Sequence, residues 1–95
     1  MTPDDKLQEL RAEIDKIDEK LLTRLNERAE IVLEIAEYKR RERLRILNED
    51  REREVIAHYK DKNRGPLSDD EIEEIVKKII EMMRTIEIRH YPQGR

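Results

Sequence analysis

The stretch that decides the fold is PDDKLQELRAEIDKIDEKLLTRLNERAEIVLEIAEYKRRER, residues 3–43. Its apolar residues recur at alternating steps of three and four, which is the spacing of one stripe along an α-helix. The stripe consists of Leu7, Leu10, Ile14, Ile17, Leu21, Leu25, Val32 and Ile35. No glycine or proline follows Pro3 until Gly65, so nothing in the stretch breaks a helix. The sequence therefore predicts one long helix over residues 3–43.

Two cations interrupt this stripe. Where the spacing calls for an apolar residue, the sequence has Arg28 and Lys39. A cation in a buried seam is costly unless an anion meets it. The two residues are eleven positions apart, close to three helical turns, which puts their Cα atoms on one face about 16 Å apart. They are therefore candidates for binding a small anionic ligand.

A second helix is expected over residues 49–62. The apolar spacing loosens after Tyr38, and residues 43–48 favour an irregular connection. Asn48 can accept hydrogen bonds from free N–H groups at the start of the second helix. The sequence Asn-Arg-Gly-Pro at 63–66 predicts that this helix ends in a left-handed residue followed by a proline.

A third helix is expected over residues 69–90. Ser68 and Glu71 form a capping-box pattern at its start. Pro92 marks a point by which the helix has ended, and residues 93–95 are expected to form a frayed tail. The apolar stripe of this helix is Ile72, Ile75, Val76, Ile79, Ile80, Met83 and Ile86.

Three helices of such unequal length predict an all-α homodimer. At 1.5 Å per residue the first helix is about 60 Å long, whereas a compact chain of this size has a radius of gyration near 12 Å. Much of the long stripe would lack a partner within its own chain. We therefore expect an intertwined, antiparallel dimer in which two long helices pair and the shorter helices cover them.

Composition narrows the function classes. The 95 residues include no cysteine, which excludes a thiolate nucleophile and a cysteine-based metal site. No apolar run is long enough to span a bilayer and the acidic N-terminal region is unlike a signal peptide, so a soluble, cytoplasmic protein is expected. The net charge of −3 argues against nucleic-acid binding. Residues 39–53 are locally basic, with seven cations against four carboxylates, which favours a small anionic ligand.

Two further arginines could reach the same ligand. Arg11 lies 17 residues, about 25 Å, before Arg28, so it is too far away on its own helix but within reach from the partner chain of an antiparallel dimer. Arg51, just beyond the connection, can fold back towards Lys39. Four converging cations suit a dicarboxylate, because arginine presents the planar fork that carboxylates prefer.

Glu87 is out of place on the apolar stripe of the third helix. It follows Ile80 by seven residues and Met83 by four. A carboxyl group that stays protonated there could donate a hydrogen bond to negative charge developing on a ligand. This role predicts activity that falls as the pH rises.

The chain closely resembles the all-helical (AroQ-type) chorismate mutases. The resemblance runs from about Leu7 to Glu87, and the joint spacing of its charged residues is its most specific part. The matching residues are Leu10, Arg11, Ile14, Ile17, Asp18, Leu21, Leu22, Leu25, Glu27, Arg28, Ile35, Lys39, Asp50, Arg51, Glu52 and Arg53. The resemblance implies an intertwined homodimer with two active sites, each completed by one arginine of the partner.

The implied reaction is the rearrangement of chorismate to prephenate, in phenylalanine and tyrosine biosynthesis, without a cofactor or metal. Catalysis would come from holding the dianion in its reactive conformer and placing donors at the breaking ether oxygen. By similarity, Lys39 would contact a carboxylate and the ether oxygen, and Glu87 would donate to that same oxygen. The implied substrate-binding residues are Arg28, Arg51 and the partner chain's Arg11 for the carboxylates, and Glu52 with Asn48 for the ring hydroxyl.

Three positions depart from the usual family pattern. Asn48 stands where aspartate is common, Met83 where a serine can occur, and Glu87 where the better-known bacterial enzymes have glutamine. None of these departures removes a cation.

Other interpretations remain open from the sequence. Isochorismate pyruvate lyases use a similar cationic pocket on the same fold. A helical dimerisation or regulatory module with an inactive pocket would show the same helices. The chain could also be one domain of a larger fusion. His58 and His90 lack the paired spacing of metal ligands and are expected on the surface.

Overall fold

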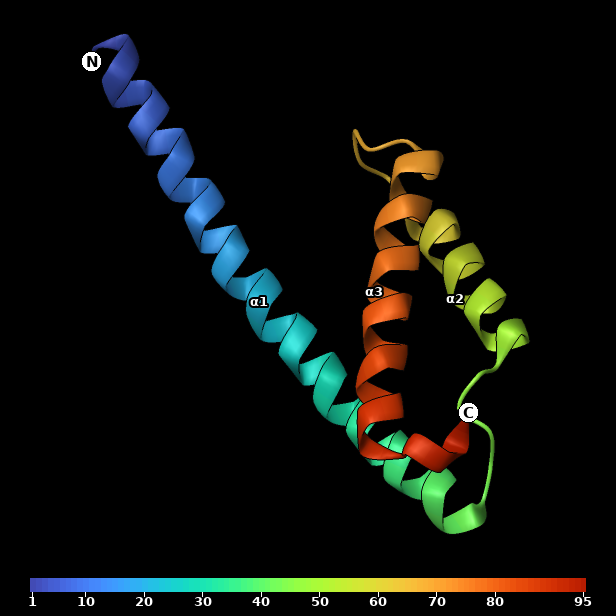
Figure 1. Ribbon diagram of the computed structural model, residues 1–95. Coiled ribbons are helices and arrows are strands. Elements are labelled where there is room, and N and C mark those ends of the chain that lie inside the picture. The colour runs from blue at the N-terminus through green and yellow to red at the C-terminus, as the bar shows by residue number, and fades with distance from the viewer. The chain divides into compact units, whose positions relative to one another are not determined.

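The computed structural model describes all 95 residues and contains helices only (Figure 1). Three α-helices are followed by one short 3₁₀-helix: α1 (Pro3–Glu42), α2 (Glu49–Lys62), α3 (Asp69–His90) and η1 (Pro92–Gly94). The predicted all-α class is confirmed, and every helix boundary lies within one residue of its expected place. None of the helices combines the length and apolar character that crossing a bilayer requires. The chain divides into two units, residues 1–31 and 32–95.

The start of α1 follows from its first residues. The backbone N–H of Asp5 donates to the Thr2 hydroxyl over 3.1 Å, and the backbone N–H of Thr2 donates to the Asp5 carboxylate over 3.1 Å. Pro3 occupies the first helical position, where no N–H is needed. The hydrogen bonds from Thr2 hold the pKa of Asp5 below its ordinary value. The N-terminus of the long helix is therefore fixed by reciprocal capping.

The end of α1 is a left-handed turn at Arg43, which has φ of 58°. The N–H of Arg43 donates to the carbonyl oxygen of Arg40 over 3.3 Å, and the N–H of Leu44 donates to that of Lys39 over 2.8 Å. This pair of hydrogen bonds is a Schellman motif, in which the left-handed position is usually glycine. Arg43 adopts the conformation despite its Cβ atom, so α1 ends under mild backbone strain.

The second helix begins as expected and ends differently. Asn48 accepts a hydrogen bond from the N–H of Arg51 over 3.0 Å and is the N-cap of α2. The prediction of a left-handed residue at the C-terminus is wrong, because Asn63 is extended and neither glycine has positive φ. Instead, the Asn63 amide donates to the carbonyl oxygen of Leu67 and to Asp69 over 2.8 and 3.0 Å. A side chain thus closes the turn that a glycine was expected to make.

Helices α2 and α3 lie side by side and antiparallel (Figure 1). The predicted capping box of Ser68 and Glu71 opens α3. Two ion pairs join α2 and α3, one towards each end of the helix pair. Lys60 meets Glu73 over 2.6 Å near the turn, and Glu52 meets Arg84 over 2.8 Å at the other end.

A small hydrophobic core lies in the 32–95 unit, where all the buried side chains are found. It draws on the end of α1, the following connection, α3 and the residue after α3. Its members are Val32, Ala36, Ile46, Val76, Met83 and Tyr91. Ala36 is completely buried, which shows how closely a neighbour approaches this part of α1.

The C-terminal segment is ordered, so the expected frayed tail is wrong. Residues 92–94 form η1, and Gly94 is buried. The N–H of Ile46 donates to the Gly94 carbonyl oxygen over 2.8 Å, which fastens η1 to the connection after α1. A Cβ atom at position 94 would lie 2.3 Å from the ring of Tyr91, so only glycine fits there without rearrangement.

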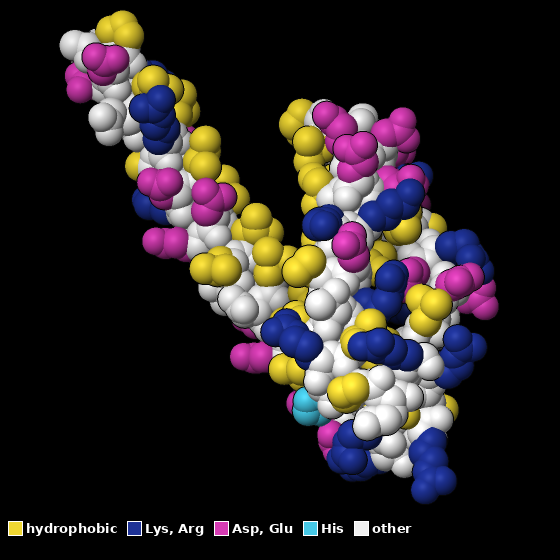
Figure 2. Space-filling view, viewed as in Figure 1, with side chains coloured by type: hydrophobic (Ala, Val, Ile, Leu, Met, Phe, Trp, Pro, Cys, Tyr) yellow, Lys and Arg dark blue, Asp and Glu magenta, His cyan; other side chains and the backbone are white.

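The 1–31 unit is the N-terminal part of α1 and buries none of its residues. Its predicted apolar stripe exists but is uncovered, and Figure 2 shows hydrophobic side chains following this helix. The stripe residues Leu7, Leu10, Ile14, Ile17 and Leu21 are between 44 and 62% exposed. A lone helix with an exposed apolar face gains little stability by itself.

Candidate active site

The centre of the candidate site is an ion pair between α1 and α3. Lys39 Nζ lies 3.0 Å from Glu87 Oε2, and the two side chains are 18 and 13% exposed. Lys39 also donates to the carbonyl oxygen of Ile46 over 2.8 Å. The structure therefore brings together the two residues predicted to be catalytic, although they are separated by 48 positions in the sequence.

Lys39 opens onto a cavity formed by the connection between α1 and α2. The cavity has a volume of about 630 Å³, enough for a small organic ligand. It is lined by Lys39, Leu44, Arg45, Leu47, Asn48, Glu49, Asp50 and Arg53. Two of the predicted site residues, Lys39 and Asn48, thus share one cavity. Arg45 and Arg53 also line it and were not predicted as site residues.

Asn48 caps the N-terminus of α2 and also lines this cavity. Its side-chain oxygen accepts the N–H of Arg51, which is the capping role usual for asparagine or aspartate. The amide Nδ2 group remains as a donor that a ligand could use. The departure from aspartate therefore preserves the cap and replaces an acceptor by a donor.

Arg51 does not reach Lys39. Its guanidinium donates to Glu54 over 3.0 Å, and its side chain is 64% exposed. Arg51 and Glu54 are three positions apart on α2, so their local ion pair competes with the predicted contact between Arg51 and Lys39. Arg51 is available to an incoming anion at the small cost of an exposed ion pair.

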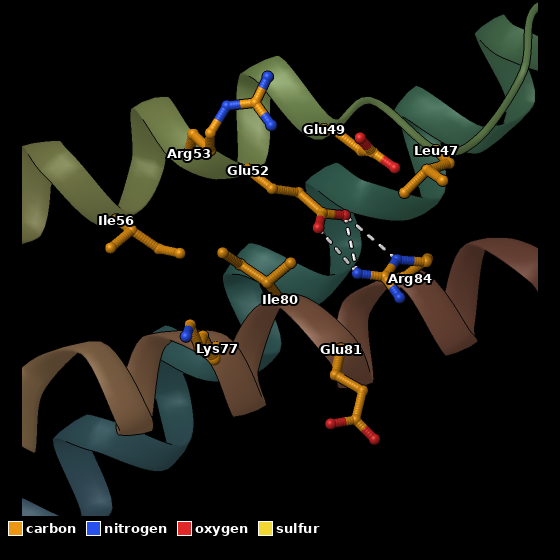
Figure 3. Close-up of a pocket in the computed structure, with 9 residues that line it drawn as sticks. All are labelled: Leu47, Glu49, Glu52, Arg53, Ile56, Lys77, Ile80, Glu81 and Arg84. Carbon is orange, nitrogen blue, oxygen red and sulfur yellow. Dashed lines mark hydrogen bonds and ion pairs between the residues drawn. The ribbon is translucent and has the colours of Figure 1, made fainter.

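Glu52 faces a second cavity, between α2 and α3, of about 570 Å³. Figure 3 shows Glu52 and Arg84 pointing towards one another across it. The two cavities share three lining residues, Leu47, Glu49 and Arg53, so they are neighbours. Arg84 was missed by sequence reasoning. Its position four residues after Ile80, at the edge of the apolar stripe of α3, was the available signal.

The remaining predicted residues lie in three places. Met83 is 8% exposed and belongs to the core. It therefore offers an apolar surface where a serine would offer a polar contact. Arg28 is half-buried and Arg11 is exposed, both in the 1–31 unit. Neither arginine forms an ion pair within the chain, so both guanidinium groups are free for an anionic partner.

A separate charged cluster joins α1 to the end of α3. His90 Nε2 lies 3.1 Å from Glu37 Oε2, and Arg40 donates to both carboxylate oxygens of Glu37. Hydrogen bonds from Arg40, and secondarily from His90, lower the pKa of Glu37 to about 2. The same contact raises the pKa of Arg40. His90 is 41% exposed, consistent with the surface position expected for it.

The sequence matches known proteins over most of its length. The sequence profile described as chorismate mutase type II matches residues 10–88. The bifunctional chorismate mutase/prephenate dehydratase of Pseudomonas aeruginosa is 32% identical over 92 residues, and that of Stutzerimonas stutzeri is 30% identical over 92 residues. The corresponding protein of Aquifex aeolicus is 48% identical over 52 residues, which are 55% of this chain.

The chain spans only part of these relatives. The alignments with the Pseudomonas and Stutzerimonas proteins cover 92% of this chain but only 25% of each relative. The alignment with the Aquifex protein covers 14% of that relative. Each relative therefore contains much sequence that has no counterpart here.

A solved structure agrees with the fold. The crystal structure of chorismate mutase from Helicobacter pylori in complex with prephenate superposes with a TM-score of 0.85 and 25% sequence identity. The superposition covers 96% of this chain and 99% of that one. Together with the profile match over residues 10–88, these likenesses show that the chain belongs to the chorismate mutase type II family.

Proposed function

We propose that this chain catalyses the rearrangement of chorismate to prephenate, in the cytoplasm and without a cofactor or metal. The observation that carries the proposal is the mostly buried Lys39–Glu87 pair, whose lysine lines a cavity and whose two members stand at the positions where the family resemblance expects its catalytic groups. The reaction is intramolecular, because the ether C–O bond that breaks and the C–C bond that forms belong to the same chorismate molecule. The protein therefore needs to supply orientation and electrostatic stabilisation only.

Lys39 is suited to stabilise charge on the breaking ether oxygen. An ammonium group has three donors, and two of them are directed at Ile46 and Glu87. The third is free for the substrate. These fixed acceptors hold the cation in place before the substrate arrives, which avoids reorganisation during the reaction.

Glu87 would donate to the same oxygen when it is protonated. In the free protein it accepts a hydrogen bond from Lys39. A proton on Oε1 would make Glu87 a second donor, while Oε2 still accepts the hydrogen bond from Lys39.

The substrate carboxylates would be held by arginines. Arg51 has only an exposed, local ion pair to give up, and Arg28 has none. Glu52 and the Asn48 amide would meet the ring hydroxyl. The partner chain's Arg11 would complete each site, as the antiparallel arrangement allows.

The proposed assembly is a homodimer held together by the α1 stripe. The first five residues of the stripe, Leu7 to Leu21, are 44 to 62% exposed, and covering each of them contributes roughly 1 kcal/mol. A second copy of α1 presents the same stripe, so the surface is self-complementary. The exposure of this stripe supports a partner that covers the helix along its length.

The activity is tested by following the loss of chorismate absorbance. We expect turnover by the unsubstituted protein and a decrease in kcat of at least about 100-fold in Lys39→Ala, because electrostatic stabilisation of the developing charge is lost. Lys60→Ala removes another partly buried lysine from an ion pair with a carboxylate, outside the two cavities, and should keep its activity. Equal rates in the unsubstituted protein and Lys39→Ala would contradict the proposal. Release of pyruvate from isochorismate would indicate a lyase instead.

The dimer is tested by sedimentation of two charge-matched variants. Leu21→Asp places a carboxylate in the centre of the stripe and should give a monomer of 11.6 kDa with little activity. Thr23→Asp lies on the opposite side of α1, at about 100° per residue, and should remain a dimer. A fully active monomer of the unsubstituted protein would rule out the assembly and the role of Arg11.

A further inference from the structure

Three hydrogen bonds join Glu52 to Arg84. Arg84 Nη2 donates to Glu52 Oε1 over 2.8 Å and to Oε2 over 2.9 Å, while Nε donates to Oε2 over 3.1 Å. The planar guanidinium thus lies along the carboxylate in the fork geometry that only arginine provides. This contact fixes the orientation of the Glu52 carboxylate and not merely its distance from α3.

The geometry leaves one oxygen of Glu52 ready for a ligand. A carboxylate oxygen accepts about two hydrogen bonds. Oε2 already accepts two from Arg84, whereas Oε1 accepts one. Glu52 and Arg84 both line the cavity between α2 and α3 (Figure 3), so the carboxylate that has this free acceptor position borders the space for a ligand.

The ion pair between Lys60 and Glu73 joins the same two helices and serves as a comparison for a contact with a structural role alone. Lys60 and Glu73 are 35 and 31% exposed, close to the 36 and 27% of Arg84 and Glu52. Neither Lys60 nor Glu73 lines either of the two cavities, and the lysine is a point charge without fixed orientation. Helices α2 and α3 are therefore already tied together at one end without Arg84.

We propose that Arg84 is a positioning residue that orients Glu52 to accept the ring hydroxyl of the substrate. The inference rests on the proposed function and adds to it a residue that was not among the predicted site residues. Arg84 acts through Glu52. Without it, the Glu52 side chain would have to be ordered by the substrate itself, which weakens binding.

The first measurement compares steady-state kinetics of Arg84→Met, Arg84→Lys and the control Lys60→Met. Arg84→Met keeps the length of the side chain but removes the fork, and KM for chorismate should rise about tenfold with kcat within about twofold. Arg84→Lys keeps the charge and should fall between these values, because lysine cannot hold both oxygens. Lys60→Met loses an equally exposed ion pair and should leave KM unchanged. Thermal melting of each variant identifies any loss of folding.

The second measurement uses a chorismate analogue in which hydrogen replaces the ring hydroxyl. Because Arg84 acts through the hydroxyl contact, Arg84→Met and the unsubstituted protein should have the same KM for this analogue. In a Glu52→Gln background, the further change Arg84→Met should likewise have no effect on KM for chorismate, since the two changes break one contact.

Three results would overturn the inference. One is an unchanged KM for chorismate in Arg84→Met. Another is an equal rise in KM for chorismate and the analogue, which would mean that Arg84 binds another part of the substrate. The third is a rise in KM in Lys60→Met as large as in Arg84→Met, which would make the effect one of helix packing. Lack of turnover by the unsubstituted protein would refute the proposed function itself, and this role with it.

Discussion

Lys39 and Glu87 form the most buried ion pair of the chain, with Nζ 3.0 Å from Oε2. The pair joins the last turn of α1 to the last turn of α3. Because Lys39 also donates to Ile46, the lysine links three segments of the structure. Substitutions at this point should therefore affect both chemistry and stability.

The pH dependence of turnover should change in Glu87→Gln. Glutamine remains a donor at every pH, so the fall in activity at high pH expected for a protonated Glu87 should disappear. The measurement is kcat against pH for both proteins. Glu74→Gln changes an exposed carboxylate of the same helix that lines neither cavity, and should keep the original profile. Identical profiles for Glu87→Gln and the unsubstituted protein would contradict a donor role for Glu87.

Removing Lys39 should cost stability as well as activity. Lys39→Ala leaves the Glu87 carboxylate mostly buried without its cation, and we expect a loss of about 2 kcal/mol in the free energy of unfolding. The double variant Lys39→Ala with Glu87→Ala should recover part of this loss, since no unpaired charge remains. Urea denaturation of the two variants measures the coupling. Additive losses would show that the pair contributes nothing as a pair.

Gly94→Ala should loosen the contact that orders Lys39. The new methyl group would lie 2.3 Å from the Tyr91 ring, so η1 must shift and its hydrogen bond to Ile46 is lost. We expect a loss of about 1 to 3 kcal/mol and a several-fold decrease in kcat, because Ile46 is one acceptor of Lys39. Gly65→Ala is the control, since its nearest neighbour would be 4.0 Å away and its φ is not positive. It should be neutral or slightly stabilising.

Arg43→Gly should stabilise the chain. The left-handed conformation at Arg43 costs a residue with a Cβ atom roughly 1 kcal/mol, part of which glycine regains. Arg41→Gly, two residues earlier inside α1, should instead destabilise by about 1 kcal/mol. Opposite changes in the urea midpoints of the two variants would confirm the prediction, and changes of the same sign would contradict it.

Stability should depend on Glu37 at acid pH. Its pKa is lowered from 4.5 to about 2, so the folded chain binds fewer protons than the unfolded chain between these values. Its contribution is complete above pH 4.5 and is lost as the pH falls towards 2. Glu37→Gln should flatten the dependence of the unfolding free energy on pH in this interval. High salt should reduce the difference, because the cluster is exposed to solvent.

Local patterns predicted the helices well. The boundaries of α1, α2 and α3 follow from apolar spacing and from caps at Thr2 and Ser68, which act within one turn. The way in which the chain turns after α1 and after α2 has no such local signal. Arginine does not favour the left-handed conformation of residue 43, and the Asn63 side chain closes its turn through contacts up to six residues away.

Part of the candidate site is visible in the sequence, for a related reason. Lys39, Glu87 and Asn48 interrupt or begin a pattern, so their positions are visible in the sequence. The pairing of Glu52 with Arg84 spans 32 positions and depends on how α2 and α3 are set against each other. The contribution of the partner chain's Arg11 stays a prediction.

The continuity of α1 from Pro3 to Glu42 has a genetic consequence. In the proposed dimer, a chain with Arg11→Ala impairs only its partner's site, whereas a chain with Lys39→Ala impairs only its own. When the two inactive chains exchange subunits, one site of each mixed dimer carries both defects and the other carries none. An equal mixture should then recover about a quarter of normal activity, so two alleles that are each inactive alone would complement each other.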